Sequence, residues 1–179
     1  MVGADYLTIM ALTERGTVHC LVERDGQFVE SWASPPDYPP VNNLLTHDYS
    51  GDGVDELVLG NEESVEVLAW LDGDWLPIWQ NYPWGQVNGV FSAGQDLWVN
   101  TTQNILYVYR WREGDFTLVR NITANRVNMR SPVVTRLKTN FVFAGGETSP
   151  HKGFGLWQPT TTELREIWYS GPLGLVKSV

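Results

Sequence analysis

The chain has 179 residues, of which 42% are hydrophobic, so it can build a domain with its own core and is not a disordered chain. Its formal net charge of −9 disfavours nucleic acid and anionic membranes as partners, because phosphate groups repel an acidic surface. The sequence contains no apolar run of about 18 residues, so no membrane-inserted helix is expected. The first residues show no signal-peptide pattern, which favours a cytoplasmic protein while the localisation stays open.

The chain begins with an incomplete unit of short alternating strands. Strands are expected at 6–12, 17–23 and 28–32, with a polar turn at 24–27. This unit lacks the opening strand that the later units have. The C-terminal segment 172–179 resembles the opening strand of the last unit, so we expect it to complete the first unit.

Three complete units follow, each with four expected strands. The second has strands at 41–47, 55–60, 64–70 and 75–79, the third at 87–92, 96–100, 105–111 and 116–119, and the fourth at 133–137, 140–144, 153–157 and 164–168. A turn with the Asp-Gly or Glu-Gly signature precedes the closing strand of the second and third units. The same plan therefore recurs along the chain.

Tryptophan at the closing strands sets the length of the repeat. Trp32 and Trp79 are 47 residues apart, and Trp79 and Trp168 are 89 apart, which is two further units. Repeats of about 40 to 50 residues with four strands each are typical of propeller blades. The sequence therefore predicts an all-β fold.

The predicted fold is a single β-propeller domain, residues 1–179, with four blades of four antiparallel strands. The blades are expected at 5–34 plus 172–179, 41–80, 86–123 and 131–170, and the C-terminal strand completes the first blade. Two alternatives keep the blades: an arc of a larger propeller, or a half-ring completed by dimerisation. A β-sandwich is the alternative without blades, because its strands also alternate.

An acidic loop in the second unit has the spacing of a calcium loop. Oxygen-bearing side chains stand at alternate positions and a glycine, Gly53, allows a sharp turn. The expected ligands are Asp48, Ser50, Asp52, the backbone carbonyl of Val54, and Glu56. A turn of Asp and Ser residues without a metal remains the alternative, because these residues form turns in any case.

The stretch 48–60 resembles the FG-GAP repeat of integrin α-subunit propellers and of bacterial VCBS-type repeats. The resemblance rests on Asp48, Ser50, Asp52, Gly53, Glu56, Leu57, Val58 and Gly60, with Ser50 where the repeat usually has Asp or Asn. It is confined to this stretch, since the equivalent positions 92–95 and 137–140 lack the acids. The resemblance implies a propeller with a structural calcium ion and an interaction role, and does not imply an enzyme.

Catalytic motifs are absent from the sequence. The three histidines lie in different units, and no nucleophile elbow, phosphate loop or His-Glu-x-x-His motif occurs. Aromatic residues in the loops between units are the better indication of a binding surface, and the alternative is a loop ring folded back over a blade edge. Tyr82 and Trp84 lie in one inter-blade loop and Tyr38 in another, positions suited to a protein partner or a sugar face.

The sequence therefore predicts a non-catalytic scaffold propeller that binds a protein partner and carries a structural calcium loop. A lectin-like, carbohydrate-binding propeller and an accessory domain of a larger enzyme are the alternatives. Lectin propellers usually repeat their sugar contacts in every blade, whereas the inter-blade loops of this chain differ from one another.

Overall fold

The computed structural model describes residues 8–123, 129–137, 140–147 and 154–171, and the side chains of 8–123 and 156–171. In these described residues, fifteen strands form four antiparallel sheets. The first sheet contains β1 (Thr8–Leu12), β2 (Val18–Arg24) and β3 (Gln27–Ala33). The second contains β4 (Val41–His47), β5 (Glu56–Asn61), β6 (Val65–Leu71) and β7 (Asp74–Asn81). The third contains β8 (Val87–Ala93), β9 (Asp96–Thr101), β10 (Ile105–Arg112) and β11 (Asp115–Thr123), and the fourth β12 (Met129–Leu137), β13 (Asn140–Glu147), β14 (Phe154–Pro159) and β15 (Leu164–Tyr169).

The predicted strands are therefore confirmed in all four units, and each complete unit forms one up-and-down sheet in chain order. The turns before the closing strands of the first three sheets have positive φ at both central residues, the conformation that tight hairpins require. These residue pairs are Asp25–Gly26, Asp72–Gly73 and Glu113–Gly114. The part of the chain that the structure describes contains no helical segment with the length and hydropathy of a membrane span.

A β-bulge recurs between the third and fourth strands of each complete sheet and at the equivalent place in the first. It falls at Cys20/Leu21, Val67/Leu68, Val108/Tyr109 and Leu156/Trp157. A bulge inserts one residue and increases the local twist of a sheet. The four units thus repeat the same backbone irregularity as well as the same strands.

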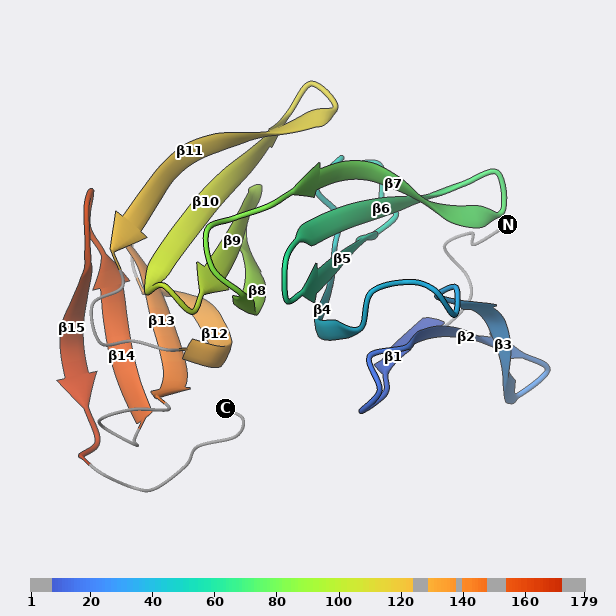
Figure 1. The fold of residues 1–179 in the computed structure, drawn as a ribbon, viewed down its shortest axis with the longest axis horizontal. Helices are drawn as coiled ribbons and strands as arrows, with labels where there is room; N and C mark the ends of the chain where they lie inside the picture. The colour runs from blue at the N-terminus through green and yellow to red at the C-terminus, as the bar shows by residue number, and fades with distance from the viewer. Residues whose placement is uncertain (1–7, 124–128, 138–139, 148–153, 172–179) are drawn as a thin grey trace.

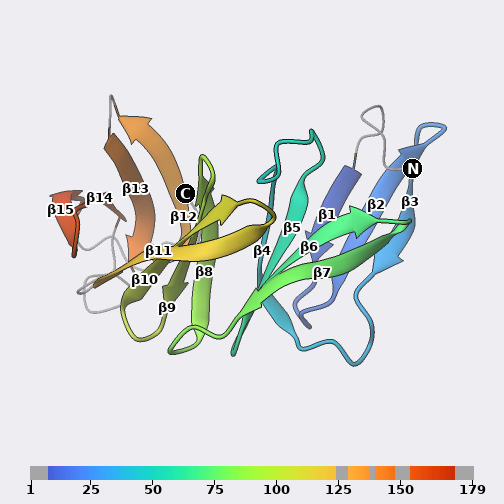
Figure 2. The same cartoon turned by 90° about the horizontal axis from the view of Figure 1, so that it is seen from above.

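The four sheets stand next to one another along an arc (Figure 1). Contacts between them run in chain order: β1 contacts β4, β4 and β5 contact β8, and β8 contacts β12. Figures 1 and 2 both place the first and fourth sheets at opposite ends of this arc. The pairing predicted for 172–179 lies outside the described residues, so the completion of the first blade stays a prediction.

Among the side chains that the structure describes, the hydrophobic core forms three layers between neighbouring sheets. Val18, Leu57 and Trp75 belong to the layer between the first and second sheets. Val67 and Val99 belong to the next layer, and a third layer joins the third and fourth sheets. Every residue of β5 and β9 is buried, because both faces of these strands are covered by a neighbouring sheet.

Candidate functional site

The connecting loops divide between the two ends of the sheets. Successive loops in an antiparallel sheet alternate between its ends. The connections 13–17, 34–40, 62–64 and 82–86 therefore share one end, which we call the linker face. The acidic loop 48–55 joins β4 to β5 and lies at the opposite end. The two regions singled out from the sequence are thus on different faces.

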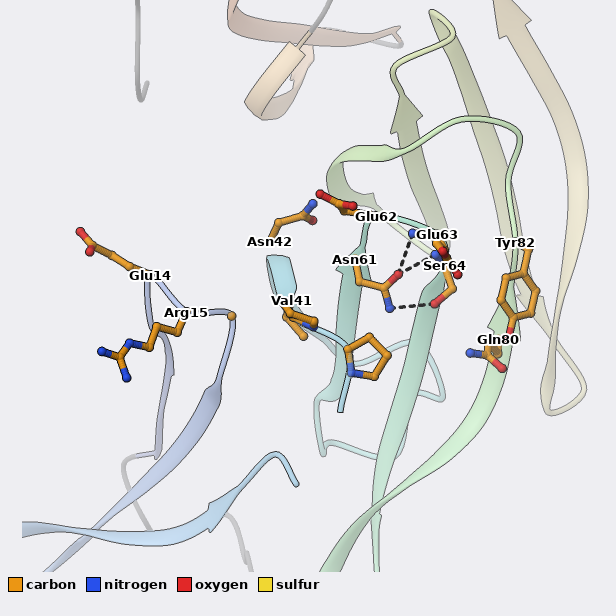
Figure 3. A pocket seen from close by; sticks show the side chains of 13 residues that line it. Glu14, Arg15, Val41, Asn42, Asn61, Glu62, Glu63, Ser64, Gln80 and Tyr82 are labelled. Atoms are coloured by element: carbon orange, nitrogen blue, oxygen red, sulfur yellow. Dashed lines mark hydrogen bonds between the residues drawn. The ribbon is translucent and has the colours of Figure 1, made fainter. Parts of the chain in front are cut away.

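A groove of about 510 Å³ opens on the linker face between the first two sheets. Its lining comes from the β1–β2 loop, the start of β4, the β5–β6 loop and the end of β7: Glu14, Arg15, Gly16, Pro39, Pro40, Val41, Asn42, Asn61, Glu62, Glu63, Ser64, Gln80 and Tyr82. Figure 3 shows Glu14 and Arg15 across the groove from Asn61 and Glu63. Three glutamates against one arginine make the groove acidic.

One wall of the groove is a turn held by its own side chains. Asn61 Nδ2 donates to Ser64 Oγ at 2.9 Å, and Asn61 Oδ1 accepts the backbone N–H groups of Glu63 at 2.8 Å and Ser64 at 2.7 Å (Figure 3). Asn61 and Ser64 are buried, so these bonds satisfy polar groups that have left water. The exposed carboxylates of Glu62 and Glu63 are therefore presented from a fixed backbone.

Tyr82 and Trp84 are the most exposed large aromatic residues of the described chain, each with 67% of its surface accessible. Their loop is nevertheless anchored. Pro83 between them is buried, and the Trp84 N–H donates to the Tyr107 hydroxyl at 3.2 Å. The Gln86 N–H donates to Thr102 Oγ1 at 3.1 Å. The loop holds two aromatic side chains in water on a backbone tied to the third sheet.

Tyr38 has a different position. It packs against the core layer between the first two sheets, and its hydroxyl donates to Glu66 Oε2. Burial, aided by that hydrogen bond, raises the pKa of Tyr38 above its ordinary value. Gln80 donates to the other oxygen of Glu66. Tyr38 thus fastens the linker to β6, which is a structural role beside the groove.

In the acidic loop, the carboxylates of Asp48, Asp52 and Glu56 accept hydrogen bonds from the loop backbone. Asp48 Oδ1 accepts the N–H of Gly51 at 2.7 Å and Oδ2 accepts that of Gly53 at 3.0 Å. The Val54 N–H donates to Asp52 Oδ1 at 2.8 Å, and the Tyr49 N–H donates to Glu56 Oε2 at 2.7 Å. Glu56 is 5% exposed, so its carboxylate accepts this hydrogen bond in the buried part of the loop.

No protein-family model matches this chain, and no curated protein matches it. Among solved structures, the crystal structure of the WD40 β-propeller domain of Doa1 is similar, with a TM-score of 0.62 and 18% sequence identity over 92% of this chain. The chain has a β-propeller fold. The matched region is 51% of the Doa1 chain, so this propeller chain spans about half the length of that structure.

The likeness to a WD40 domain concerns the fold alone. It does not bear on the FG-GAP resemblance of residues 48–60, which stays a prediction. In the described part of the propeller, no three His, Cys, Asp or Glu side chains are gathered so that they could hold a metal. As arranged, the oxygens of Asp48, Asp52 and Glu56 serve the backbone and do not converge on one point. Calcium binding at Asp48, Ser50, Asp52, Val54 and Glu56 therefore stays a prediction.

Sequence reasoning did not find the groove. The pattern around Glu62 and Glu63 indicates a solvated loop, and Glu14 and Arg15 are 47 or more residues away along the chain (62 − 15). The sequence feature that could have revealed the groove is the order of strands within each unit. Once four-stranded units are recognised, the β1–β2 loop and the β5–β6 loop fall at the same end of neighbouring blades. The charged residues of these two loops could then be expected to line one surface.

Proposed function

We propose that this chain is a non-catalytic scaffold propeller that binds a protein partner on the linker face. The observation that carries the proposal is the exposure of Tyr82 and Trp84 on an anchored loop beside the groove. Large aromatic side chains are enriched among the residues that dominate protein interfaces. A backbone that is already fixed loses little freedom on binding, which favours affinity.

The charge of the groove indicates the chemistry of the partner. Glu14, Glu62 and Glu63 surround a space whose only cation among its lining residues is Arg15. Complementary charge speeds encounter and selects among partners. The partner segment is therefore one that places Lys or Arg in the groove and an apolar side chain against Trp84.

A structural calcium ion in the loop 48–56 is a second part of the proposal. Its support is the spacing of Asp48, Ser50, Asp52 and Glu56 and the resemblance to the FG-GAP repeat. The loop lies at the end of the blades away from the groove. Calcium would accordingly stiffen the second blade without entering the partner site.

The binding proposal is tested with a phage-displayed library of random peptides selected on the purified protein. We expect the enriched peptides to carry Lys or Arg together with an aromatic or aliphatic residue. Affinity of one enriched peptide is then measured by fluorescence anisotropy for wild type, Trp84→Ala and Tyr82→Ala. Removal of a central aromatic residue costs about 2 kcal/mol, which weakens binding about thirtyfold.

The control is Leu118→Ala, because Leu118 is 53% exposed on the outer strand β11 and away from the linker face. It should bind the peptide like wild type. Wild-type affinity in both aromatic variants would refute the proposed face. A glycan array run in parallel separates the lectin-like alternative, which predicts clear binding to one class of sugar. An accessory domain of a larger enzyme would give the same result in the peptide experiment. That alternative concerns which other domain this chain is linked to, and the peptide experiment does not address it.

A further inference from the structure

The groove on the linker face has one wall from the first sheet and one from the second. Carboxylates stand on both walls, and the second-sheet wall adds an amide and an aromatic ring: Glu14 and Arg15 on the first, and Glu62, Glu63, Gln80 and Tyr82 on the second. The ion pairs among the described residues are His19–Glu30 and Arg110–Asp96, so no cation of that part of the chain is paired with a groove carboxylate. These carboxylates are therefore available to a basic side chain of the partner.

The ring of Tyr82 offers that basic side chain a flat aromatic surface. Tyr82 follows β7 with 67% of its surface accessible, and Figure 3 shows its ring beside Gln80, on the wall that also carries Glu63. Its neighbours in the chain are fixed, because Asn81 Oδ1 accepts the Tyr109 hydroxyl at 2.9 Å and Pro83 is buried. A cation placed over the face of such a ring is attracted by the electrons of the ring.

Gln80 adds a neutral acceptor to the same wall. Its Nε2 donates to Glu66 Oε1, and the other oxygen of Glu66 accepts the hydroxyl of Tyr38. The amide of Gln80 is thus held by Glu66, which leaves its Oε1 as an acceptor for an N–H group from outside. The wall therefore combines a ring face, an amide oxygen and the carboxylate of Glu63.

The first-sheet wall favours any cation less selectively. Its turn is fixed, since the Gly16 N–H donates to the Thr13 carbonyl at 3.0 Å and the Thr17 N–H donates to Thr13 Oγ1 at 3.1 Å. The carboxylate of Glu14 on this turn attracts a positive charge, while Arg15 beside it repels one. A basic side chain that enters the groove is therefore directed to the second-sheet wall.

A guanidinium matches the groups of the second-sheet wall better than an ammonium does. It is planar, stacks on aromatic rings and has N–H donors along its edge, whereas a lysine ammonium is a compact point charge. We propose that the basic residue of the partner is an arginine, stacked on Tyr82 and hydrogen-bonded to Glu63 and Gln80. This inference rests on the proposed function, and it names Tyr82 as the residue that distinguishes arginine from lysine.

The test uses one enriched peptide from the selection on the purified protein and a version of it with lysine in place of the arginine. Fluorescence anisotropy measures both peptides against wild type, Tyr82→Ala and Tyr82→Phe. Wild type should bind the lysine peptide about tenfold more weakly, because stacking and the paired hydrogen bonds are lost. In Tyr82→Ala the two affinities should lie within about twofold of each other, whereas Tyr82→Phe keeps the ring and should keep the difference.

A second pair of variants examines the carboxylate. Glu63→Gln removes the charge but keeps the size of the side chain, and it should weaken the arginine peptide about tenfold. Asp72→Asn is the matched control, because it removes the same charge from the turn between β6 and β7, at the opposite end of the second sheet. It should bind like wild type, since salt screens a charge so far from the groove. Circular dichroism verifies that each variant, substituted at an exposed residue, is folded.

The failure of this inference is distinguishable from failure of the proposed function. If no selected peptide binds at the linker face, the proposed function fails and the arginine assignment fails with it. The arginine assignment alone is overturned if the enriched peptides carry lysine without arginine, or if wild type binds both peptides equally. It is also overturned if the difference persists in Tyr82→Ala or if Glu63→Gln binds like wild type.

Discussion

Substitution of Gly16 by alanine tests how the linker is attached to the first sheet. Gly16 has φ +82°, and a Cβ there would lie 2.7 Å from the Cα and Cβ atoms of Pro40 and from the backbone N of Val41. The Val41 N–H also donates to the Gly16 carbonyl at 3.0 Å. Positive φ in a residue with a side chain costs about 1 kcal/mol. Overlap with packed atoms that cannot move freely costs about 1–3 kcal/mol more.

The control is Gly26→Ala. Gly26 has φ +78°, almost the same backbone conformation, and a Cβ added there would meet nothing within 4 Å. We therefore expect Gly16→Ala to lower the free energy of unfolding by about 3 kcal/mol and Gly26→Ala by about 1 kcal/mol. Urea denaturation followed by tryptophan fluorescence measures both. An equal loss in the two variants would show that contact with Pro40 and Val41 does not hold the linker, and the reasoning would fail.

Three further predictions concern the acidic loop. Glu56→Ala leaves the Tyr49 N–H buried without its acceptor and should lower the free energy of unfolding by about 2 kcal/mol. Glu56→Gln keeps an acceptor oxygen and should lower the free energy of unfolding by less. Urea denaturation measures both variants, and equal losses would contradict the role of Glu56 as the acceptor of this hydrogen bond. If calcium binds, the melting temperature should be higher in added calcium than in chelator, and Asp52→Ala should abolish this difference. The same melting temperature for wild type in both conditions would show that residues 48–56 form a turn without a calcium ion. Burial raises the pKa of Tyr49, so this hydroxyl ionises first in the unfolded chain and the free energy of unfolding should fall as pH rises above about 10. Burial raises the pKa of Tyr38 and Tyr109 too, so Tyr49→Phe should make this alkaline slope shallower without removing it, and an unchanged slope would contradict the role of Tyr49.

Much of the fold could be predicted from local pattern. The alternation of apolar residues in 65–71 and the Asp72–Gly73 turn predict a hairpin, and β6 and β7 form it. The spacing of Trp32 and Trp79 predicts the repeat, and the four sheets follow it. These features depend on residues close together in the chain, where a side-chain period of two and the chemistry of turns decide the backbone.

The candidate site depended on contacts that no local pattern describes. Tyr38 and Trp84 have the same sequence pattern of a loop aromatic, yet Tyr38 packs on the core and bonds to Glu66 while Trp84 is exposed. Glu56 has the spacing of a calcium ligand, yet its carboxylate accepts the N–H of Tyr49. In each case the outcome depends on which neighbour is within reach, and that neighbour is supplied by another strand or loop.

The sequence by itself therefore determined the strands, their hairpins and their recurrence, because these follow from side-chain alternation and turn residues over short distances. Only the tertiary structure decided the groove between Arg15 and Asn61 and the bulges that align from sheet to sheet. These features arise when strands and sheets come together, since packing brings residues that are far apart in the chain into contact.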